Sequence, residues 1–571
     1  MEDMETRYEN KTIFLLLTVI CFMGLLLCFR SQYGVDFTDE SHYLALAKRF
    51  SQGDRPFREE WFPAQVIGIL LLPFFNIYSR ITGGTDGIIL AARIVFVIFH
   101  VMESLMVFWI LIKEEKIERV PSFIFAVLFL FYARANIHNF SYYNLGLMTF
   151  LFYLITRKNR NVLCQMGRGI LFSITVLCMP YMIIYFVLLE SRHIVQIITG
   201  KRKYKRELLY LSGIAFSTLI FLAFCFTSGN ISDIFRNIPE ILKDPEHQET
   251  IMGSLVSFGN FMICIFYKYL FWPMLAEFFG IAFYIWNGRK IEVIKIFLKV
   301  VAYMLFYIQS AYLRTFFEGG IIIALFLLAV QISALDQIYE RDLWKHYAFP
   351  GLAFGCIWML GSNVGQRVFN MGCLISCIWA VTVIWKDAYR SLKNWTGILK
   401  ICTLILTLMT LACISFFDIY RDDDIKNLTV KLNSGVAKGL YTSERRAEEY
   451  EKVLSKLNEY ADEEKVLVVE GVNPWIYLEA EAYCGAYAVW HVDFTDERNK
   501  KYYGWYPEKI PGVIFLINPS YGTYHGWRYS SHGSNTEGNE TEILEGYLKE
   551  MVEIEHYIKI EEECGIFYIK R

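Results

Sequence analysis

The sequence lacks an excess of charge of either sign, with 56 basic residues against 58 acidic ones, and only 20% of its residues are charged. The Lys and Arg residues are dispersed over many short segments and do not form the single basic stripe of a nucleic-acid-binding protein. The chain also lacks internal repeats and low-complexity tracts. We therefore expect no nucleic-acid partner.

The 13 cysteines lack the spacing of a metal site. Most of them lie inside apolar segments, where a free cysteine behaves as a small hydrophobic residue. Cys484 and Cys564 are the pair in the polar C-terminal part, and the sequence leaves open whether they form a disulfide. We expect neither a metal nor another cofactor.

Apolar residues dominate the chain, since 55% of it is hydrophobic and 17% is aromatic. This composition is typical of a membrane protein with several spans. The first apolar run, 12–29, is long enough to cross a bilayer, and no small-residue cleavage site follows it. We therefore expect an uncleaved anchor and a multi-pass protein of the cell membrane that contacts membrane lipids.

Short loops rich in Lys and Arg predict the orientation. Loops 113–119, 157–168 and 191–206 carry three, four and six basic residues, whereas loop 138–142 carries none. Loops rich in Lys and Arg lie in the cytoplasm. The acidic loop after the first span is therefore expected outside, together with the long loop 229–253, which either covers an active site or only connects two spans.

Two apolar segments do not fit as simple crossings. The stretch 63–81 lies between the outer loop and the span 87–112, so we predict an interfacial helix. The stretch 169–190 has basic loops on both sides and is broken at Met179-Pro180, so we predict a re-entrant pair of helices. The other predicted crossings are 120–137, 143–156, 207–228, 262–286, 291–311, 317–335, 347–362, 369–385 and 396–417.

The predicted fold is thus mostly α, a polytopic membrane protein with about thirteen membrane helices, including the re-entrant pair, and a C-terminal extracytoplasmic α/β domain. Its predicted parts are a transmembrane domain, 1–417, with a first outer loop, 31–86, and an outer domain, 418–571. Periodicity and turn residues in the outer domain predict helices 443–460 and 541–552, strands 466–469, 513–517, 556–560 and 565–570, and a mobile polar loop, 521–538.

The outer loop carries three carboxylates close to the membrane surface: Asp36, Asp39 and Glu40. An amphipathic helix, 41–50, is predicted to follow. A carboxylate near hydrocarbon loses hydration unless it faces a cavity, a metal or a polar substrate. The loop is therefore a candidate active site, and the alternative is a set of acids that are merely solvated.

The residues around these acids carry a family resemblance. The run Gly34-Val-Asp-Phe-Thr-Asp-Glu-Ser-His-Tyr43, followed by Trp61 and Pro63-Ala-Gln65, resembles the first outer loop of the GT-C glycosyltransferases. This superfamily includes the lipid A aminoarabinose transferases and the protein O-mannosyltransferases, which take sugar from a polyprenyl-phosphate carrier. The resemblance implies that Asp39 is the catalytic residue.

The implied reaction needs a base and cations for the leaving phosphate. One carboxylate suffices for inversion, so Asp39 would take the proton of the acceptor. Arg367, Arg314 and His138 are candidates near the outer boundary, although an Arg at a span end also snorkels to lipid head groups. The run Ser362-Asn-Val-Gly365 resembles a bacterial Ser-Asn-Thr-Gly run and favours Arg367.

Two departures from the family pattern change the expected roles. Phe62 stands where the aminoarabinose transferases have a phosphate-binding Lys, so Arg58 or another Arg would supply the charge. Asn144 stands where the family has a second Asp, which predicts catalysis without a metal. Glu40 would orient Asp39 or bind acceptor, and the expected substrate-binding residues are His138, Tyr143, Asn144 and Gln65.

The predicted function is an inverting glycosyltransferase that moves a sugar from a polyprenyl-phosphate carrier to a glycan, lipid or protein acceptor of the cell envelope, at the outer face of the plasma membrane. The alternative is a transporter or lipid flippase. Transporters place ionisable groups near mid-bilayer within inverted repeats, whereas these acids lie in an outer loop. A third possibility is a non-catalytic scaffold for the outer domain.

Overall fold

The computed structural model describes residues 2–200, 204–228, 231–242, 251–265, 297, 301, 304, 320–336, 338–361, 366–390, 395–490, 496–518, 521, 544 and 546–571. Most of the predicted crossings 262–286 and 291–311 lie outside this set, as does Arg314. All of the predicted loop 521–538 except Tyr521 lies outside it too.

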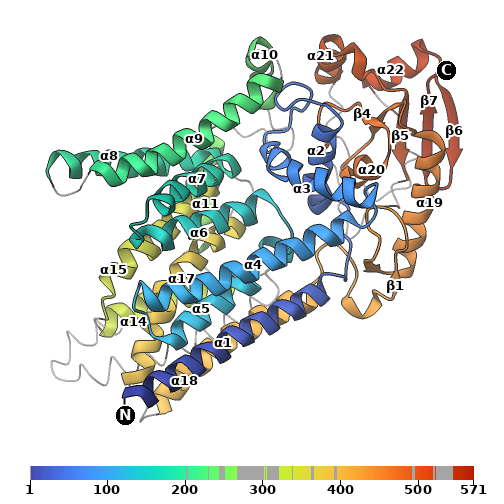
Figure 1. Cartoon of the computed structure of the whole chain (residues 1–571). Helices are drawn as coiled ribbons and strands as arrows, with labels where there is room; N and C mark the ends of the chain where they lie inside the picture. Colours follow the sequence, from blue (N-terminus) through green and yellow to red (C-terminus); the bar gives the residue numbers. More distant parts are fainter. Residues whose placement is uncertain are drawn as a thin grey trace.

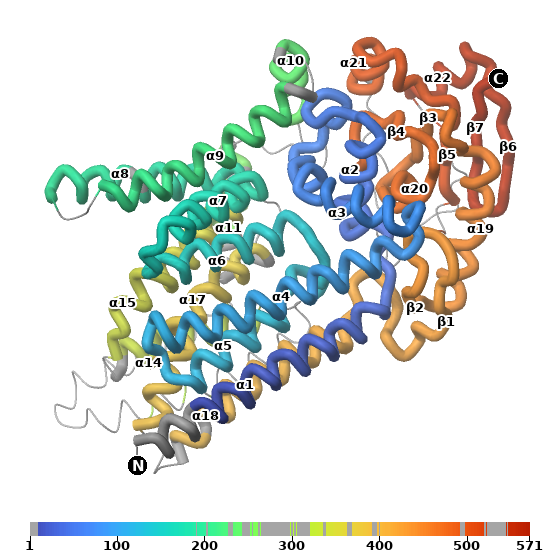
Figure 2. Tube along the Cα trace, in the orientation of Figure 1, coloured from blue at the N-terminus to red at the C-terminus, as the bar shows by residue number. Residues whose placement is uncertain are grey.

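A long helical bundle and a smaller α/β region make up the molecule, with the N-terminus at the far end of the bundle and the C-terminus in the α/β region (Figures 1 and 2). The bundle contains α1 (Glu2–Arg30), α4 (Ile88–Lys113), α5 (Arg119–Phe131), α6 (Tyr142–Ile155), α7 (Val162–Cys178), α8 (Ile183–Ile198), α9 (Tyr204–Ser228), α11 (Ile251–Ile265), α14 (Gly320–Asp336), α16 (Phe349–Leu360), α17 (Gln366–Arg390) and α18 (Trp395–Phe417).

Six helices within the described residues are long and apolar enough to cross a membrane: Asn10–Arg30, Ile88–Lys113, Pro180–Ile198, Tyr204–Phe226, Val368–Arg390 and Lys400–Phe417. Several shorter apolar helices lie among them, including Arg119–Phe131 and Val162–Cys178. The mostly helical fold with several candidate membrane spans is therefore confirmed, while the number of thirteen helices and the orientation stay predictions.

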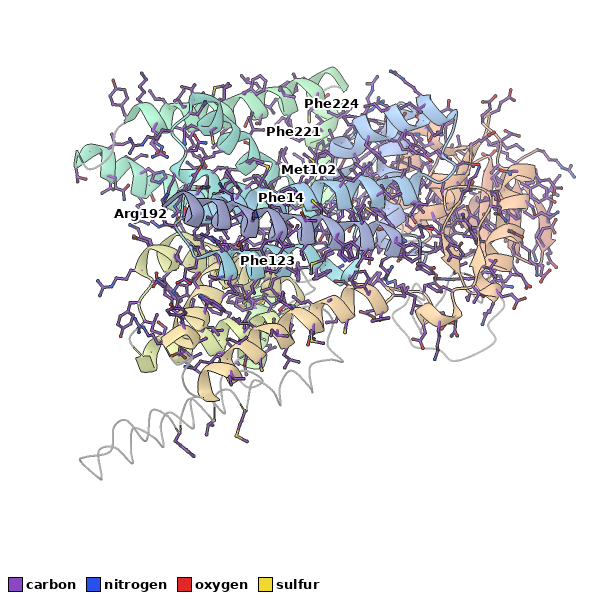
Figure 3. All side chains as sticks on the ribbon, turned by 60° about the horizontal axis from the view of Figure 1, so that its bottom comes forward. Phe14, Met102, Phe123, Arg192, Phe221 and Phe224 are labelled. Carbon is purple, nitrogen blue, oxygen red and sulfur yellow. The ribbon has the colours of Figure 1, made fainter. Side chains whose placement is uncertain are left out.

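Large apolar side chains cover the outside of the bundle. Phe14 and Met102 are 72% and 53% exposed, and Figure 3 shows them projecting from the ribbon of the bundle. An apolar surface of this kind is unfavourable in water and suits contact with lipid. Membrane insertion accounts for it.

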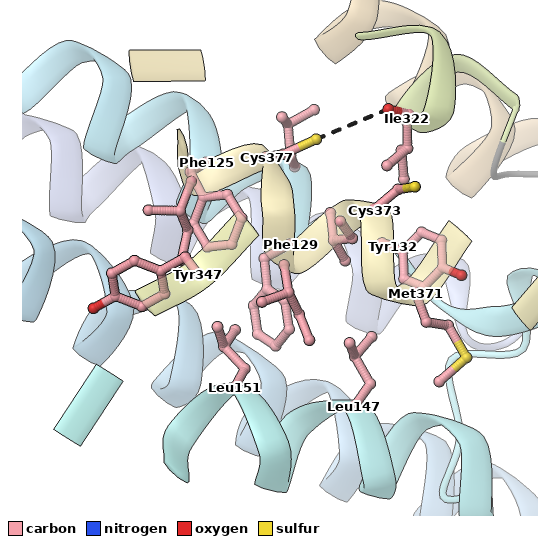
Figure 4. Close-up of a cluster of buried hydrophobic side chains, with 14 of the residues drawn as sticks. Phe125, Phe129, Tyr132, Leu147, Leu151, Ile322, Tyr347, Met371, Cys373 and Cys377 are labelled. Atoms are coloured by element: carbon pink, nitrogen blue, oxygen red, sulfur yellow. Dashed lines mark hydrogen bonds between the residues drawn. The ribbon is translucent and has the colours of Figure 1, made fainter. Parts of the chain in front are cut away.

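The bundle interior is closely packed with aromatic and aliphatic side chains. Phe125 and Phe129 of α5 lie against Leu147 and Leu151 of α6 and against residues of α17 (Figure 4). Cys373 and Cys377 are fully buried free thiols in this cluster, as predicted for small hydrophobic residues. Cys484 and Cys564 are also buried and free, so they do not form a disulfide.

The described basic loops meet at one end of the bundle. Arg157 pairs with Glu115 at 2.9 Å, and Arg206 donates to the Arg157 carbonyl. Lys386 pairs with Glu340 at 2.5 Å, and the adjacent Trp385 donates to Glu118 at 2.7 Å, which joins this region to the loop that carries Glu115. These contacts place the loops on one side, in agreement with their common assignment by charge.

The two unusual apolar segments form broken or short helices. The predicted interfacial segment is α3 (Val66–Thr82), which ends at Gly83 with a left-handed φ of 77°. The break at Met179-Pro180 is confirmed, since α7 ends at Cys178 and α8 begins at Ile183. Phe172 of α7 packs against Tyr185 of α8 across this break.

The C-terminal part is an α/β region with a five-stranded sheet in the order β4-β3-β5-β7-β6. Its strands are β3 (Val466–Val469), β4 (Tyr483–Cys484), β5 (Val513–Ile517), β6 (Ile558–Glu562) and β7 (Gly565–Ile569). β3 runs parallel to β4 and β5, whereas β7 is antiparallel to its neighbours. Its helices are α19 (Glu444–Tyr460), α20 (Pro474–Glu479), α21 (Asp496–Trp505) and α22 (Gly546–Ile554), and β1 (Val430–Lys431) pairs with β2 (Tyr441–Thr442).

The first outer loop and this α/β region share one hydrophobic core. Leu46 of α2 (Asp39–Ser51) and Ile67 of α3 belong to the same buried cluster as Trp475 and Phe515. Buried polar contacts join the same parts, because Arg49 pairs with Asp54 and Glu60 at 2.6 and 2.8 Å and donates to the Tyr502 hydroxyl. α2 is therefore held by the C-terminal region as well as by the membrane domain.

Candidate active site

Asp36 organises the start of α2. One of its carboxylate oxygens accepts from the backbone and hydroxyl of Thr38, at 3.0 and 2.7 Å, and the other accepts from the backbone of Glu40 at 2.9 Å. A carboxylate that receives the free N–H groups of a helix start stabilises the helix and suits its positive end. The helix therefore begins at Asp39, two residues before the predicted start at 41.

Glu40 is fully buried in an ion pair. Arg93 of α4 donates to both of its oxygens at 2.6 Å, and Asn139 donates to one of them at 2.7 Å. This bidentate arrangement is the strong geometry for an Arg-carboxylate pair. Both oxygens are occupied, which favours the orienting role of Glu40 over acceptor binding.

Asp39 lies beside residues that follow the last membrane helix. The Tyr420 hydroxyl donates to Asp39 Oδ2 at 2.6 Å, and Arg421 Nη1 lies 3.4 Å from the same oxygen. The side chain of Asp39 is 18% exposed, whereas those of Asp36 and Glu40 are closed off. Asp39 is thus the carboxylate of the three that a substrate can reach.

The electrostatics of the two aspartates differ. Burial by itself raises the pKa of Asp39, but Arg421, Arg134 and the Tyr420 hydrogen bond outweigh it and hold that pKa below its ordinary value. Burial, reinforced by the charge of Asp39, raises the pKa of Asp36 to about 6. Asp39 is therefore ionised at neutral pH and carries the negative charge of the site.

Arg134 is a second guanidinium near Asp39. It belongs to a short 3-10 turn, η1 (Arg134–Asn136), between α5 and α6, and it is buried at 8% exposure. Its guanidinium stacks on the Tyr143 ring at 4.3 Å, a cation-π contact. Its Nε has no hydrogen-bond partner among the described residues, so this buried cation has donor capacity to spare.

Asn144 holds the turn that presents Arg134. Its Oδ1 accepts from the Arg134 backbone at 3.0 Å, and its Nδ2 donates to the carbonyls of Ile137 and Asn139, both at 2.9 Å. All three contacts join the Asn144 side chain to backbone atoms of the segment between α5 and α6. Asn144 therefore has a structural role here, and the side chains that it positions face the site.

His138 lies beside the acidic loop. It lines a cavity of about 30 Å³ together with Asp36, Glu40, Arg93 and Tyr420. Burial lowers the pKa of His138 well below its ordinary value, so the ring is neutral. The cavity has room for water but not for a sugar.

Two predicted residues lie away from Asp39. Arg58 pairs with Glu59 at 3.2 Å and approaches Asp233 of α10 (Ile231–Ile241) at 3.6 Å. Gln65 is fully buried, accepts from the Phe57 backbone at 2.6 Å and donates to the carbonyls of Glu60 and Phe62. These side chains fix the outer loop, and no contact joins either of them to Asp39.

Two other predicted residues cannot be placed in the site. Arg367 belongs to the first turn of α17, but its side chain lies outside the described part of the chain, as Arg314 does altogether. The loop 229–253 contributes α10, where Asn237 donates to the carbonyls of Phe57 and Arg58 at 3.0 Å. It covers the outer loop beside Arg58 and thereby serves as more than a connector.

Arg93, Arg134, Tyr420 and Arg421 were not predicted from the sequence as residues of the site. A signal for the first two was present, because Arg93 and Arg134 fall inside predicted spans, where an ionisable residue marks a functional site. Tyr420 and Arg421 directly follow the last span, and only the fold brings them to Asp39. Within the described residues, no group of three or more His, Cys, Asp or Glu side chains is arranged to hold a metal ion.

No protein-family model matches the chain, and no curated protein matches it either.

Proposed function

We propose that the protein is an inverting glycosyltransferase of the GT-C type, which transfers a sugar from a polyprenyl-phosphate carrier to an acceptor of the cell envelope at the outer face of the membrane. The observation that carries this proposal is Asp39, a partly exposed carboxylate flanked by Arg421 at 3.4 Å and by the buried Arg134. The pattern combines a base with cations for a departing phosphate.

Asp39 acts on the acceptor. It takes the proton of the attacking hydroxyl or amine while the new bond forms at the sugar carbon, and the sugar-phosphate bond breaks on the opposite face. The bonding electrons leave with the phosphate. Asp36 and the Glu40-Arg93 pair keep the backbone of the Asp39 segment fixed.

Arg134 and Arg421 bind the phosphate of the carrier. Guanidinium groups form short charge-assisted hydrogen bonds with phosphate, and Arg134 has an unused Nε in a buried setting where such a bond is strong. Tyr143 keeps the Arg134 guanidinium flat against its ring. Arg367 and Arg314 are further candidates for the same role.

A transporter or flippase is the second candidate, and one observation favours it. Glu103 Oε1 and Ser104 Oγ are buried in α4 without a hydrogen-bond partner in the described residues, at a depth where ionisable groups often serve transport. The position of Asp39 outside the spans favours the enzyme.

The test uses purified protein in liposomes with polyprenyl-phosphate-linked hexoses and pentoses, and a glycan and lipid extract of the native membrane as acceptor. We expect release of polyprenyl phosphate and a product whose anomeric configuration is opposite to that of the donor, because a single displacement inverts the sugar carbon. Retention of configuration would contradict a single displacement at Asp39. Carrier movement across the bilayer without release would favour the flippase.

Arg134→Gln and Arg134→Lys separate the phosphate contact from folding. We expect the Gln variant to raise the KM for the donor about tenfold or more, and the Lys variant to recover part of it, since Lys supplies charge but no planar fork. The matched control is Arg445→Gln, an exposed arginine of α19 that pairs with its own helix neighbour Glu449 at 2.7 Å. Unchanged donor KM in Arg134→Gln would remove Arg134 from the site.

A further inference from the structure

The segment that leaves the last membrane helix is fastened to the acidic loop. After α18 ends at Phe417, Tyr420 and Arg421 both reach Asp39, and Arg421 also donates to the Thr38 hydroxyl. Asp422 accepts from the Val35 backbone and the Thr442 hydroxyl, each at 2.8 Å. The C-terminal region therefore contributes directly to the environment of the proposed base.

Arg421 has an unusual backbone. Its φ is 54°, in the left-handed region that a residue with a side chain seldom adopts. Arg446 of α19 holds this conformation by donating to the Arg421 carbonyl at 2.6 Å and to the Val35 carbonyl at 2.8 Å. Strained residues persist when the surrounding structure fixes them, and they concentrate at active sites and switch regions.

The contact has a cost for catalysis. A carboxylate that is paired with a guanidinium and accepts a tyrosine hydroxyl is a poor proton acceptor, because both partners stabilise its charged form. A general base works best when its pKa lies near the working pH. Asp39 in this arrangement is ionised but weakly basic.

We propose that Arg421 exchanges partners during the reaction, pairing with Asp39 in the free enzyme and with the donor phosphate in the donor complex. Asp39 then becomes an effective base only after the donor has bound. This inference rests on the proposed function. It gives the C-terminal region a role in the order of binding, with donor before acceptor.

The geometry favours Arg421 over Arg134 as the mobile partner. The Arg421 side chain is 22% exposed and has a long flexible stem, whereas Arg134 is buried under the constraint of Tyr143 and Asn144. A phosphate between them adds negative charge beside Asp39 and withdraws positive charge from it. Both changes make protonation of Asp39 easier.

The experiment compares two pH profiles of sugar transfer. The profile of kcat/KM for the donor reports groups of the free enzyme, and the profile of kcat at saturating donor reports groups of the complex. For wild type we expect the acid limb of kcat to lie about one pH unit or more above that of kcat/KM. Identical acid limbs in the wild type would overturn the proposal.

Arg421→Ala removes the exchanging cation. We expect its acid limb of kcat/KM to move up towards that of kcat, while Arg445→Ala keeps the wild-type separation. An unchanged separation in Arg421→Ala would also overturn the proposal. Arg421→Lys, which retains charge and stem, serves as the second variant should the Ala protein unfold, and partial separation is expected there.

The outcomes distinguish this inference from the proposed function. If the wild type transfers no sugar from any polyprenyl-phosphate donor, the proposed function fails and the inference fails with it. If the wild type transfers sugar and Asp39→Asn does not, but the acid limbs coincide, the function stands and the exchange of Arg421 alone is wrong.

Discussion

At the scale of single residues, three carboxylates within five positions have three different roles because their surroundings differ. Asp36 binds backbone N–H groups, Glu40 pairs with Arg93, and Asp39 remains partly exposed between Tyr420 and two arginines. The sequence indicated an acidic site and selected Asp39 for it by resemblance. It could not indicate that Arg93 and Arg421 pair with these acids, since both arginines lie far away in the chain and no local spacing links them to the loop.

The raised pKa of Asp36 implies that the stability of the folded protein depends on pH. The pKa is raised to about 6 in the folded protein, above the ordinary 3.8, so the contribution of Asp36 to stability is full below about pH 4 and is lost as the pH rises through 6. Two pKa units correspond to about 3 kcal/mol. Asp36→Asn removes this titration but replaces one of the two accepting oxygens by an NH2 group, which costs stability at every pH. We therefore expect the stability of Asp36→Asn relative to wild type to rise between pH 4 and pH 7.5.

Thermal unfolding of both proteins across this pH range measures the difference. Asp39 is the neighbouring acid whose charge acts on Asp36, and it stays ionised over this range because its pKa is held below the ordinary value, so the change of the difference with pH reports Asp36. A difference in stability that is the same at pH 4 and pH 7.5 would show that Asp36 is ionised throughout the range.

At the scale of elements, continuous apolar runs were the most reliable signal. The strands β3 and β5 have the predicted bounds because each is a short run of large apolar residues that is largely buried on both faces. Ends set by side-chain capping were less accurate, as α2 shows, because Asp36 extends the helix to Asp39. α22 begins at Gly546 instead of the predicted 541.

Substitution of Arg49 measures how much the buried ion pairs of α2 contribute to the stability of the protein. Arg49 is 1% exposed and pairs with Asp54 and Glu60. Arg49→Met leaves the buried Glu60 carboxylate without its cation, whereas Asp54 keeps its ion pair with Lys509. Breaking such a pair costs about 3–5 kcal/mol. We expect a large fall in the unfolding temperature, measured in detergent.

The control for Arg49 is Lys426→Met. Lys426 pairs with Asp424 at 3.4 Å, but both side chains are about three-quarters exposed, and exposed pairs contribute little. Equal effects of the two substitutions would contradict the assignment of Arg49 as a buried link between α2 and its surroundings.

For Glu103 on α4 we predict the opposite effect, a rise of the unfolding temperature when this acidic side chain is replaced. Its Oε1 is buried without a hydrogen-bond partner among the described residues, and burying an unsatisfied polar atom costs about 1–3 kcal/mol. Glu103→Met replaces it by an apolar side chain of similar size and is expected to raise the unfolding temperature. A lower unfolding temperature would reveal a stabilising contact of Glu103.

At the scale of the whole molecule, the sequence predicted a membrane part and a C-terminal α/β region but treated the outer loop as part of the first. The loop shares one hydrophobic core with the C-terminal region, and Trp61 packs against Tyr487 and Tyr502 in a second buried cluster between the same parts. Pairings across more than 400 residues leave no periodic trace in a single sequence. The position of Tyr420 and Arg421 at Asp39 depends on this shared core, which is why it could not be predicted.

The orientation of the molecule has its own test. Charge predicts the C-terminal region outside and the end of α8 inside. Ser455 of α19 and Gly200 are both exposed, so a cysteine at either position can react with a maleimide that reaches it. A membrane-impermeant maleimide applied to intact cells is expected to label Ser455→Cys and to leave Gly200→Cys unlabelled. The reverse pattern would place Asp39 on the cytoplasmic side and exclude an outer acceptor.

The most direct test of the enzyme is the rate of sugar transfer by Asp39→Asn. Asparagine keeps the size and most hydrogen bonding of Asp39 but lacks a basic oxygen, so we expect the rate to fall about 10²-fold or more with little change in unfolding temperature. Glu40→Gln, which weakens the pair with Arg93, is expected to lower stability and to affect the rate less. Transfer by Asp39→Asn at the wild-type rate would contradict the assignment of Asp39 as the catalytic base.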